Sequence, residues 1–412
     1  MGSYEIFIML ICLSAAFAFI NQKFLKLPFV IGLFFLSTIL SLVVLSSQLW
    51  IDIDVQKIES FLENSKIDKL IIDVFLGFLL FAGALHTNWG DLRTQIKSIT
   101  SFALGGVIMS TGIIACLFYF VAGFLGIEID FVYCLLFGAL ISPTDPIAVL
   151  GILKKAGVSK KTESVIVGES LFNDGVGVVL FIALLDTLRV GSFSFGDFGV
   201  LFIQEAVGGV ILGLVYGYIL HLLLKAVDHY ETEILITLAF VMGGYYIANY
   251  FHISGALSMV VMGLMVGNFR TNVSMSDTTQ EYVNKFWELV DVVLNALLFI
   301  VIAFVLIEVD FKTEYVILGL LSVIIVLFTR SFLVYLPLSI FPKFFNLNKN
   351  DARIISWGGL RGGLSLALVL SLPVSPVKDV LLVATYFTVL FSILIQGLTI
   401  GKVAQWGKKT KS

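Results

Sequence analysis

The sequence predicts an all-α polytopic membrane protein with about thirteen transmembrane helices, and three observations support this fold class. Of the 412 residues, 58% are hydrophobic and only 13% are charged, whereas soluble domains carry about 25% charged residues. The chain also divides into thirteen apolar segments, each near the ~20 residues that a helix needs to cross a bilayer. Finally, Lys and Arg alternate between the connections as thirteen crossings require. A surface this apolar needs lipid as its solvent.

The predicted spans follow one another with short connections. Residues 4–20 lack the basic n-region and the A-x-A site of a signal peptide, so we count them as the first span. No connection is long enough for a soluble domain, and we therefore expect residues 1–412 to form a single transmembrane domain. The thirteen spans are predicted at residues 4–20, 27–47, 69–86, 98–122, 131–153, 162–188, 199–224, 231–249, 253–268, 286–307, 314–340, 352–372 and 379–400.

The distribution of basic residues predicts the orientation of the chain. With thirteen spans, 18 of the 26 Lys and Arg residues fall on the side after the first span, and six, including Lys57, Lys66 and Lys69, fall on the other. Cytoplasmic loops carry the excess of Lys and Arg. We therefore expect a multi-pass protein of the cytoplasmic membrane, with its N-terminus outside and its C-terminus inside.

The odd number of spans predicts an inverted repeat. Residues of about 4–188 and 231–400 would be related by an axis in the membrane plane, with the seventh span as connector. Spans 5 and 12 then correspond to each other, and both are interrupted by helix breakers and a charge: the run 142–146 is Ser-Pro-Thr-Asp-Pro, and the run 358–363 is Gly-Gly-Leu-Arg-Gly-Gly. Interrupted segments at matching positions of two repeats indicate the binding site of a transporter.

Charged residues inside the spans are the strongest functional candidates. Each costs at least ~2.5–3.5 kcal/mol at the bilayer centre and is functional by default. Asp174 lies near the midpoint of span 6, and Ser170 lies one turn before it on the same helix face. We interpret these two side chains as a ligand pair. The five intramembrane charges are Asp145, Glu169, Asp174, Arg330 and Arg361.

Glu169 needs a partner of its own, because it lies about 140° around the helix from Asp174. Arg330 in span 11 is predicted at a similar depth in the inner half of the membrane. A buried Arg–carboxylate pair is typically bidentate and structural. We therefore favour a structural ion pair over a direct part in transport.

The interruptions of spans 5 and 12 offer a different kind of ligand. Pro143 and Pro146 have no N–H to donate, so the backbone around Thr144 is expected to unwind and to offer carbonyl oxygens to a cation. Asp145 can face the positive N-terminal end of the second half-helix, and Arg361 can balance negative C-terminal ends. For both charges, compensation of helix dipoles without contact to an ion stays open.

The remaining polar residues give weaker signals. Asp291 and Asn295 are four apart in span 10 and are candidates to line a cavity. The histidines lie at span ends, where an interfacial role is favoured over proton relay; they are His86, His221, His229 and His252. The cysteines are expected to act as small hydrophobic residues, with no metal centre, disulfide or cofactor; they are Cys12, Cys116 and Cys134.

Together these motifs resemble the monovalent cation:proton antiporters, specifically the electroneutral sodium/proton exchanger branch. The run at 142–146 matches the Thr-Asp-Pro crossover motif, and Glu169-Ser170-x-x-Asn173-Asp174 matches the Asn-Asp ion-binding motif. Arg330 and the run 359–362, Gly-Leu-Arg-Gly, match two further signatures. The motifs occur in family order over almost the whole chain.

The resemblance implies a fold, an activity and residue roles. It implies crossed broken helices in a core bundle of spans 4–6 and 11–13, with a homodimer bundle made of the remaining spans. Asp174 would be the shared Na+/H+ site, and Ser170 and the Thr144 carbonyl would assist it. Asn173 would position the crossover, and its neutral side chain implies electroneutral exchange. The resemblance also implies that Glu169 and Arg330 form the family's core ion pair. Asp145 would stabilise the crossover.

One departure and several alternatives accompany this interpretation. Several archaeal relatives carry a Glu in span 3, where this chain has Ala82, so one cation ligand is absent. Exchange of Na+ or Li+ for H+ is favoured over K+/H+ or broad monovalent cation exchange, and over a cation channel or ion-sensing subunit, since channels usually assemble rings of like residues. An enzyme is disfavoured because the sequence contains no Walker loop, HExxH or nucleophile elbow. Membrane lipid is the expected partner, and nucleic acid is not.

Overall fold

The computed structural model describes residues 3–47, 74–145, 147–190, 195–273, 277–308, 312–373 and 375–409. Several features predicted from the sequence lie outside these ranges. They are residues 69–73 of the third span, Pro146, and the basic residues Lys57, Lys66, Lys69 and Lys411.

Every element in the described residues is helical. Three of them, η1, η3 and η4, are π-helical stretches that continue or connect α-helices. The elements in chain order are α1 (Ser3–Ile20), η1 (Asn21–Leu25), α2 (Phe29–Ser47), α5 (Leu76–Leu85), α6 (Trp89–Thr94), α7 (Ile96–Thr100), η3 (Ser101–Gly106), α8 (Val107–Phe124), α9 (Phe131–Ile141), α10 (Ile147–Lys155), α11 (Lys160–Val190), α12 (Phe195–Ala226), α13 (Tyr230–Tyr250), α14 (Gly255–Val273), α15 (Asp277–Glu308), α16 (Thr313–Ile340), α17 (Pro342–Phe345), α18 (Lys349–Trp357), α19 (Gly363–Leu370), α20 (Pro376–Phe391), η4 (Ser392–Gln396) and α21 (Gly397–Lys409).

The predicted fold class is confirmed, because the described part of each of the thirteen apolar segments contains helical structure. Within the described residues, eight helical stretches are long and apolar enough to cross a membrane by length and composition, and three shorter apolar helices accompany them. Some boundaries differ from the predicted ones. For example, α15 begins at Asp277, whereas the predicted span begins at 286. The helix continues past the apolar segment because polar residues outside the hydrocarbon layer can still form helical hydrogen bonds.

Two short helices, α6 and α17, were not predicted. Their lengths of 6 and 4 residues are far below a membrane crossing, so hydropathy does not reveal them. The side chain of Asn88 starts α6 by accepting a hydrogen bond of 3.2 Å from the Asp91 N–H. As a result α6 turns the chain between α5 and α7.

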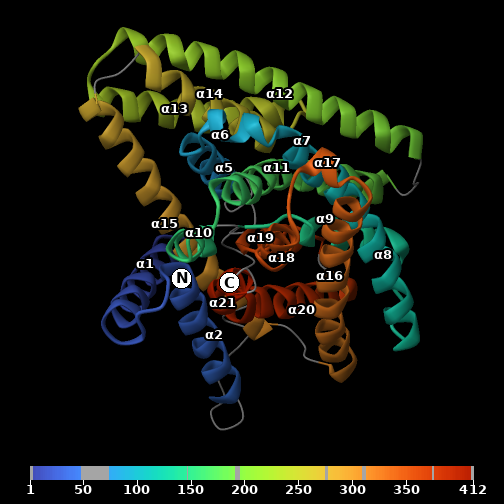
Figure 1. Ribbon diagram of the computed structural model, residues 1–412. Helices are drawn as coiled ribbons and strands as arrows, with labels where there is room; N and C mark the ends of the chain where they lie inside the picture. The colour runs from blue at the N-terminus through green and yellow to red at the C-terminus, as the bar shows by residue number, and fades with distance from the viewer. Residues whose placement is uncertain are drawn as a thin grey trace.

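Helix packing brings distant segments together (Figure 1). One group of contacts joins α12, α13, α14 and α5, while another joins α8, α9, α16, α19 and α20. The long helix α11 contacts members of both groups, and α15 packs on α1, α2, α5, α13 and α19. These contacts place α11 beside the two interrupted segments.

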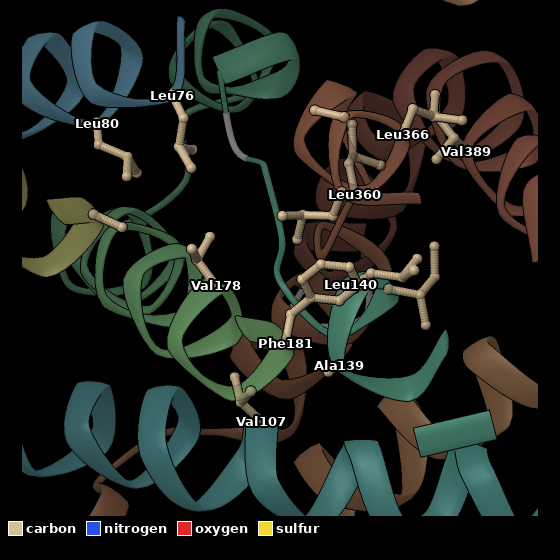
Figure 2. Packing of buried hydrophobic residues seen from close by; sticks show 14 of the residues in the cluster. Leu76, Leu80, Val107, Ala139, Leu140, Val178, Phe181, Leu360, Leu366 and Val389 are labelled. Carbon is tan, nitrogen blue, oxygen red and sulfur yellow. The ribbon is translucent and has the colours of Figure 1, made fainter. Parts of the chain in front are cut away.

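Buried apolar residues fill the space around the interruptions. Figure 2 shows Phe181 of α11 close to Leu140 of α9, with Leu360 from the link between α18 and α19 nearby. Phe181, Leu140 and Leu360 are each at most 1% exposed. This close packing holds the interrupted segments against α11 and so fixes the polar groups described next.

Candidate functional site

Two broken helices meet at the centre of the site. Between α9 and α10 the chain leaves the helix after Ile141, and between α18 and α19 it does so from Gly358 to Gly362. The two links are joined directly, since the Asp145 N–H donates to the Leu360 carbonyl at 2.7 Å. Backbone groups released from helical hydrogen bonds need such partners at membrane depth.

The π-helical stretch η4 supplies a further partner for the second link. The Arg361 N–H donates to the hydroxyl of Ser392 at 2.8 Å, and Ser392 is the first residue of η4. Local departures from α-helical geometry of this kind are frequent at functional sites. The hydropathy of the sequence does not reveal this π-helical stretch.

Helix α11 braces the first link through Asn173. Its side-chain carbonyl accepts from the Thr144 N–H at 3.1 Å, and its amide nitrogen donates to the Thr144 hydroxyl at 2.9 Å. The hydroxyl of Ser170, one turn earlier, donates to the Thr144 carbonyl. Asn173 and Ser170 are 1% and 2% exposed, so these hydrogen bonds are shielded from water. The N–H and the carbonyl of Thr144 are thus both hydrogen-bonded to side chains of α11.

Asp174 follows Asn173 and lines a cavity of about 630 Å³. Thr144, Asp145 and Ser170 line the same cavity, which extends to Lys154 in the last turn of α10 and to Lys160, the first residue of α11. These lysines lie on the side that the basic residues predict to be cytoplasmic. The cavity therefore connects that side with Asp174. Among the described residues, no group of three or more His, Cys, Asp and Glu side chains is placed to hold a metal ion.

The two charges in the links compensate helix ends of the opposite segment. The carboxylate of Asp145 lies against Gly362, which precedes α19: a Cβ added to Gly362 would lie 2.6 Å from Oδ2 of Asp145. The guanidinium of Arg361 donates to the carbonyls of Ser142 and Pro143, the latter at 2.9 Å, at the C-terminal end of α9. A carboxylate at a helix N-terminus and a cation at a C-terminus are both stabilising.

Glu169 and Arg330 form a bidentate ion pair. Nη2 of Arg330 lies 2.9 Å from Oε2 of Glu169, and Nη1 donates to Oε1. Nη2 also donates to the Ile355 carbonyl at 3.1 Å, so the pair joins α11, α16 and α18. A Cβ at Gly359 would lie 2.6 Å from Nε of Arg330. Glycine at 359 thus leaves the space through which the Arg330 side chain reaches Glu169.

Residues of α5 and α15 form another part of the cavity wall. Asp291 and Asn295 line it, and the Asn295 amide donates to Oδ1 of Asp291 at 3.2 Å. Ala82 and Gly83 line the cavity from α5, so neither position supplies a side-chain oxygen to it.

Sequence reasoning missed several cavity residues. These are Asp91, Glu163 and Glu288; His86, for which an interfacial role was predicted, lines the cavity as well. Glu288 was detectable in principle, since it lies three residues before Asp291 and so on the same face of α15. His86, Asp91 and Glu163 lie near helix ends, where polar residues are common and give no distinct signal.

Comparison with known proteins shows which family the chain is similar to. A family model described as "Sodium/hydrogen exchanger, transmembrane" matches residues 8–406. The chain is 42% identical to the Na+/H+ antiporter NhaP of Pseudomonas aeruginosa over 401 residues, covering 96% of this chain and 95% of that protein. It is 34% identical to the Na+/H+ antiporter NhaH of Halobacillus dabanensis, covering 97% of each chain.

Solved structures show the same fold. The structure of the sodium proton antiporter MjNhaP1 from Methanocaldococcus jannaschii at pH 8 has a TM-score of 0.79, with 21% sequence identity, covering 98% of this chain and 97% of that one. At this identity the likeness concerns the fold alone.

Proposed function

The chain belongs to the transmembrane sodium/hydrogen exchanger family, and from this premise we propose that it exchanges Na+ for H+ across the cytoplasmic membrane. The observation that carries the proposal is the position of Asp174. It lines a cavity of about 630 Å³ that Ser170 and Thr144 also line, so the cavity wall offers a carboxylate and hydroxyl groups beside the broken helix. Oxygen ligands of this kind suit a hard cation.

Coupling requires only competition for Asp174. A protonated carboxyl group has lost the negative charge that attracts Na+, and a carboxylate that binds Na+ has its charge neutralised already. The empty, charged site would cross the membrane slowly because of the cost of a buried charge. Each switch of access therefore carries either Na+ or H+, and the two fluxes are linked.

The ligand set that we propose is the Asp174 carboxylate, the Ser170 hydroxyl and the Thr144 carbonyl. In the structure the Ser170 hydroxyl donates to the Thr144 carbonyl. A hydroxyl rotates to suit its partners, so an entering Na+ would turn the Ser170 proton away and meet two oxygens already in contact. The hydrogen bonds of Asn173 would keep Thr144 in place during this change.

Electroneutral exchange follows from the charges at the site. Asn173 is neutral, so Asp174 is the carboxylate of this pair that can change its charge on each crossing. Glu169 is compensated by Arg330, and Asp145 lies at the N-terminal end of α19. One Na+ would then exchange for one H+.

Alternating access would come from movement of one bundle against another. We propose that spans 4–6 and 11–13 form the moving core, that the remaining spans form a homodimer bundle, and that the N-terminus is outside. The cavity supports an inward-facing arrangement, since it reaches Lys154 and Lys160 on the side predicted to be cytoplasmic. Rocking around a fixed midplane site is a common mode of secondary transport.

Exchange in vesicles reconstituted with the purified protein tests the proposal. An imposed Na+ gradient should drive H+ in the opposite direction, and clamping the membrane potential should leave the rate unchanged. The Asp174→Asn variant should be inactive; coupled exchange by this variant would contradict the assignment. Substituting Li+ and K+ for Na+ decides the ion preference, while Na+ flux without H+ flux would indicate a channel.

A further inference from the structure

A second, smaller cavity is lined by residues of α16, of the link from Gly358 to Gly362, of α20 and of η4. Its volume is about 10 Å³, and a space of roughly 10–15 Å³ is enough for one water molecule. The residues that line it differ from those that line the cavity at Asp174. Its polar side chains are those of Arg330, Arg361, Thr388 and Gln396.

Each of the two arginines keeps one N–H group without an acceptor. Among the residues that the structure describes, neither Nε of Arg330 nor Nε of Arg361 has a hydrogen-bond partner, and both atoms are buried. Nε of Arg330 lies beside Gly359, which also lines the cavity, because a Cβ added there would lie 2.6 Å from it. Arg361 is 3% exposed. A guanidinium carries only donors, so each Nε–H needs an acceptor that these side chains do not supply.

The other two polar side chains can supply acceptors. The Thr388 hydroxyl donates to the Ala384 carbonyl at 2.8 Å, and its contact with the Ser322 hydroxyl at 3.0 Å uses at most one of its two lone pairs. The Gln396 amide nitrogen donates to the Trp357 carbonyl at 3.0 Å. That contact fixes the orientation of the amide and leaves its carbonyl oxygen to accept. Two donors and two acceptors therefore surround a space of the size of one water.

An anion matches this arrangement less well than a water molecule does. A chloride ion is larger than water and has no proton to give to the oxygens of Thr388 and Gln396. The charge of Arg330 is already balanced by its bidentate pair with Glu169. A neutral ligand that both accepts and donates hydrogen bonds leaves the charges of the core unchanged and satisfies all four groups.

We propose that this cavity binds one structural water molecule, whose oxygen accepts hydrogen bonds from Nε of Arg330 and Nε of Arg361. Its two protons go to the Thr388 hydroxyl oxygen and to the Gln396 carbonyl oxygen. The water thereby connects the Glu169–Arg330 pair to the crossing of the two broken helices. Buried waters typically make about three hydrogen bonds and are costly to remove. The site does not depend on the proposed function.

A density map of the purified protein, at a resolution that shows ordered waters, tests the site directly. We expect one peak within about 2.7–3.2 Å of both Nε atoms. Crystals grown with bromide in place of chloride distinguish the two kinds of ligand, because bromide gives an anomalous signal and water does not. A peak without anomalous signal supports the proposal. A bromide peak, or the absence of any peak between the two arginines, overturns it.

Filling the cavity tests the same site in solution. Val326 lines the cavity and is 4% exposed, so Val326→Ile adds a methyl group beside it. In a dry cavity this methyl group would fill a void and raise the unfolding temperature. If it displaces the bridging water, two buried N–H groups lose their acceptor. We therefore expect Val326→Ile to unfold at a lower temperature in detergent, and a higher one would overturn the proposal.

A second background separates loss of the water from simple overpacking. In the double variant Glu169→Leu with Arg330→Met one of the two Nε–H donors is gone, so the loss caused by Val326→Ile should fall to about half. Overpacking alone would cost the same in both backgrounds, and equal losses would overturn the proposal. Val260→Ile is the matched control, because Val260 of α14 is buried but lines neither cavity. Its effect should be the same in both backgrounds.

Discussion

Nη1 of Arg361 lies 2.9 Å from the carbonyl oxygen of Pro143, 218 residues away in the sequence. The same nitrogen also donates to the Ser142 carbonyl, so one guanidinium donates hydrogen bonds to two carbonyls at the C-terminal end of α9. Arg361 is 3% exposed. The crossing of the two broken helices therefore depends on a charge from one segment placed at a helix end of the other.

Replacing Arg361 by Met should weaken the crossing. Removing one member of a buried charge arrangement costs about 3–5 kcal/mol, and the Ser142 and Pro143 carbonyls would also lose their donor. We expect a lower unfolding temperature in detergent and loss of exchange. Arg361→Lys is the control, because it keeps the charge but lacks the planar guanidinium and its fixed donor geometry. It should lie between wild type and Arg361→Met; equal stability of all three proteins would contradict this role.

The Glu169–Arg330 pair is predicted to be structural. Glu169→Leu and Arg330→Met should each destabilise the protein by about 3–5 kcal/mol, because each leaves a buried charge without its partner. The double variant Glu169→Leu with Arg330→Met should recover much of this loss. Thermal unfolding of the four proteins gives the coupling energy. A stable double variant that still exchanges Na+ for H+ supports the structural role, whereas a stable but inactive one would indicate a direct part in transport.

The hydrogen bonds between Asn173 and Thr144 should depend more on the shape of the side chain at position 173 than on its charge. Asn173→Leu removes both hydrogen bonds between Asn173 and Thr144. Each buried group left without a hydrogen bond costs about 1–3 kcal/mol. In Asn173→Asp the acceptor for the Thr144 N–H remains, and the Thr144 hydroxyl can donate instead of accepting. We therefore expect Asn173→Asp to unfold at a higher temperature than Asn173→Leu. The reverse order would show that the added charge outweighs the hydrogen bonds.

Gly362 is required because Asp145 lies against it. A Cβ at this position would lie 2.6 Å from Oδ2 of Asp145, so Gly362→Ala should displace the carboxylate and reduce the exchange rate by at least tenfold. Gly83→Ala is the matched control: Gly83 lines the same cavity, but no atom lies within 4 Å of its added Cβ. Rates measured in vesicles at equal protein content compare the two. Similar losses in both variants would argue against a specific contact.

Competition at Asp174 predicts the direction of the pH dependence. Where H+ occupies the site, the apparent KM for Na+ should rise by up to tenfold for each unit by which pH falls, while the maximal rate at saturating Na+ stays nearly constant. Initial rates over a matrix of Na+ concentration and pH measure this. An apparent KM that is independent of pH, with a maximal rate that changes instead, would exclude a shared site.

The sequence predicted much of the fold because its signals are local. Bilayer thickness sets the length of each apolar segment, and Pro143 in span 5 and the glycines of span 12 mark breaks that need no knowledge of neighbours. All thirteen predicted segments coincide with helices. The short helices α6 and α17 escaped prediction, since neither is long enough to leave a hydropathy signal. Local signals also identified the site candidates, because polar groups stand out in apolar or broken segments; these candidates are Asp174, Ser170 and Thr144.

Which groups meet across the molecule was decided by the tertiary structure alone. Helical spacing shows that Ser170 and Asp174 share a face, but it does not show that Asn173 bonds the N–H and the hydroxyl of Thr144. It does not show that Asp145 lies at the start of α19, or that His86 reaches the Asn284 carbonyl. Hydrophobicity and periodicity determine which residues leave water for lipid or protein. Partners across 29 to 219 residues of sequence depend instead on how the helices pack, and each buried polar group must find its partner there because no water is present to replace it.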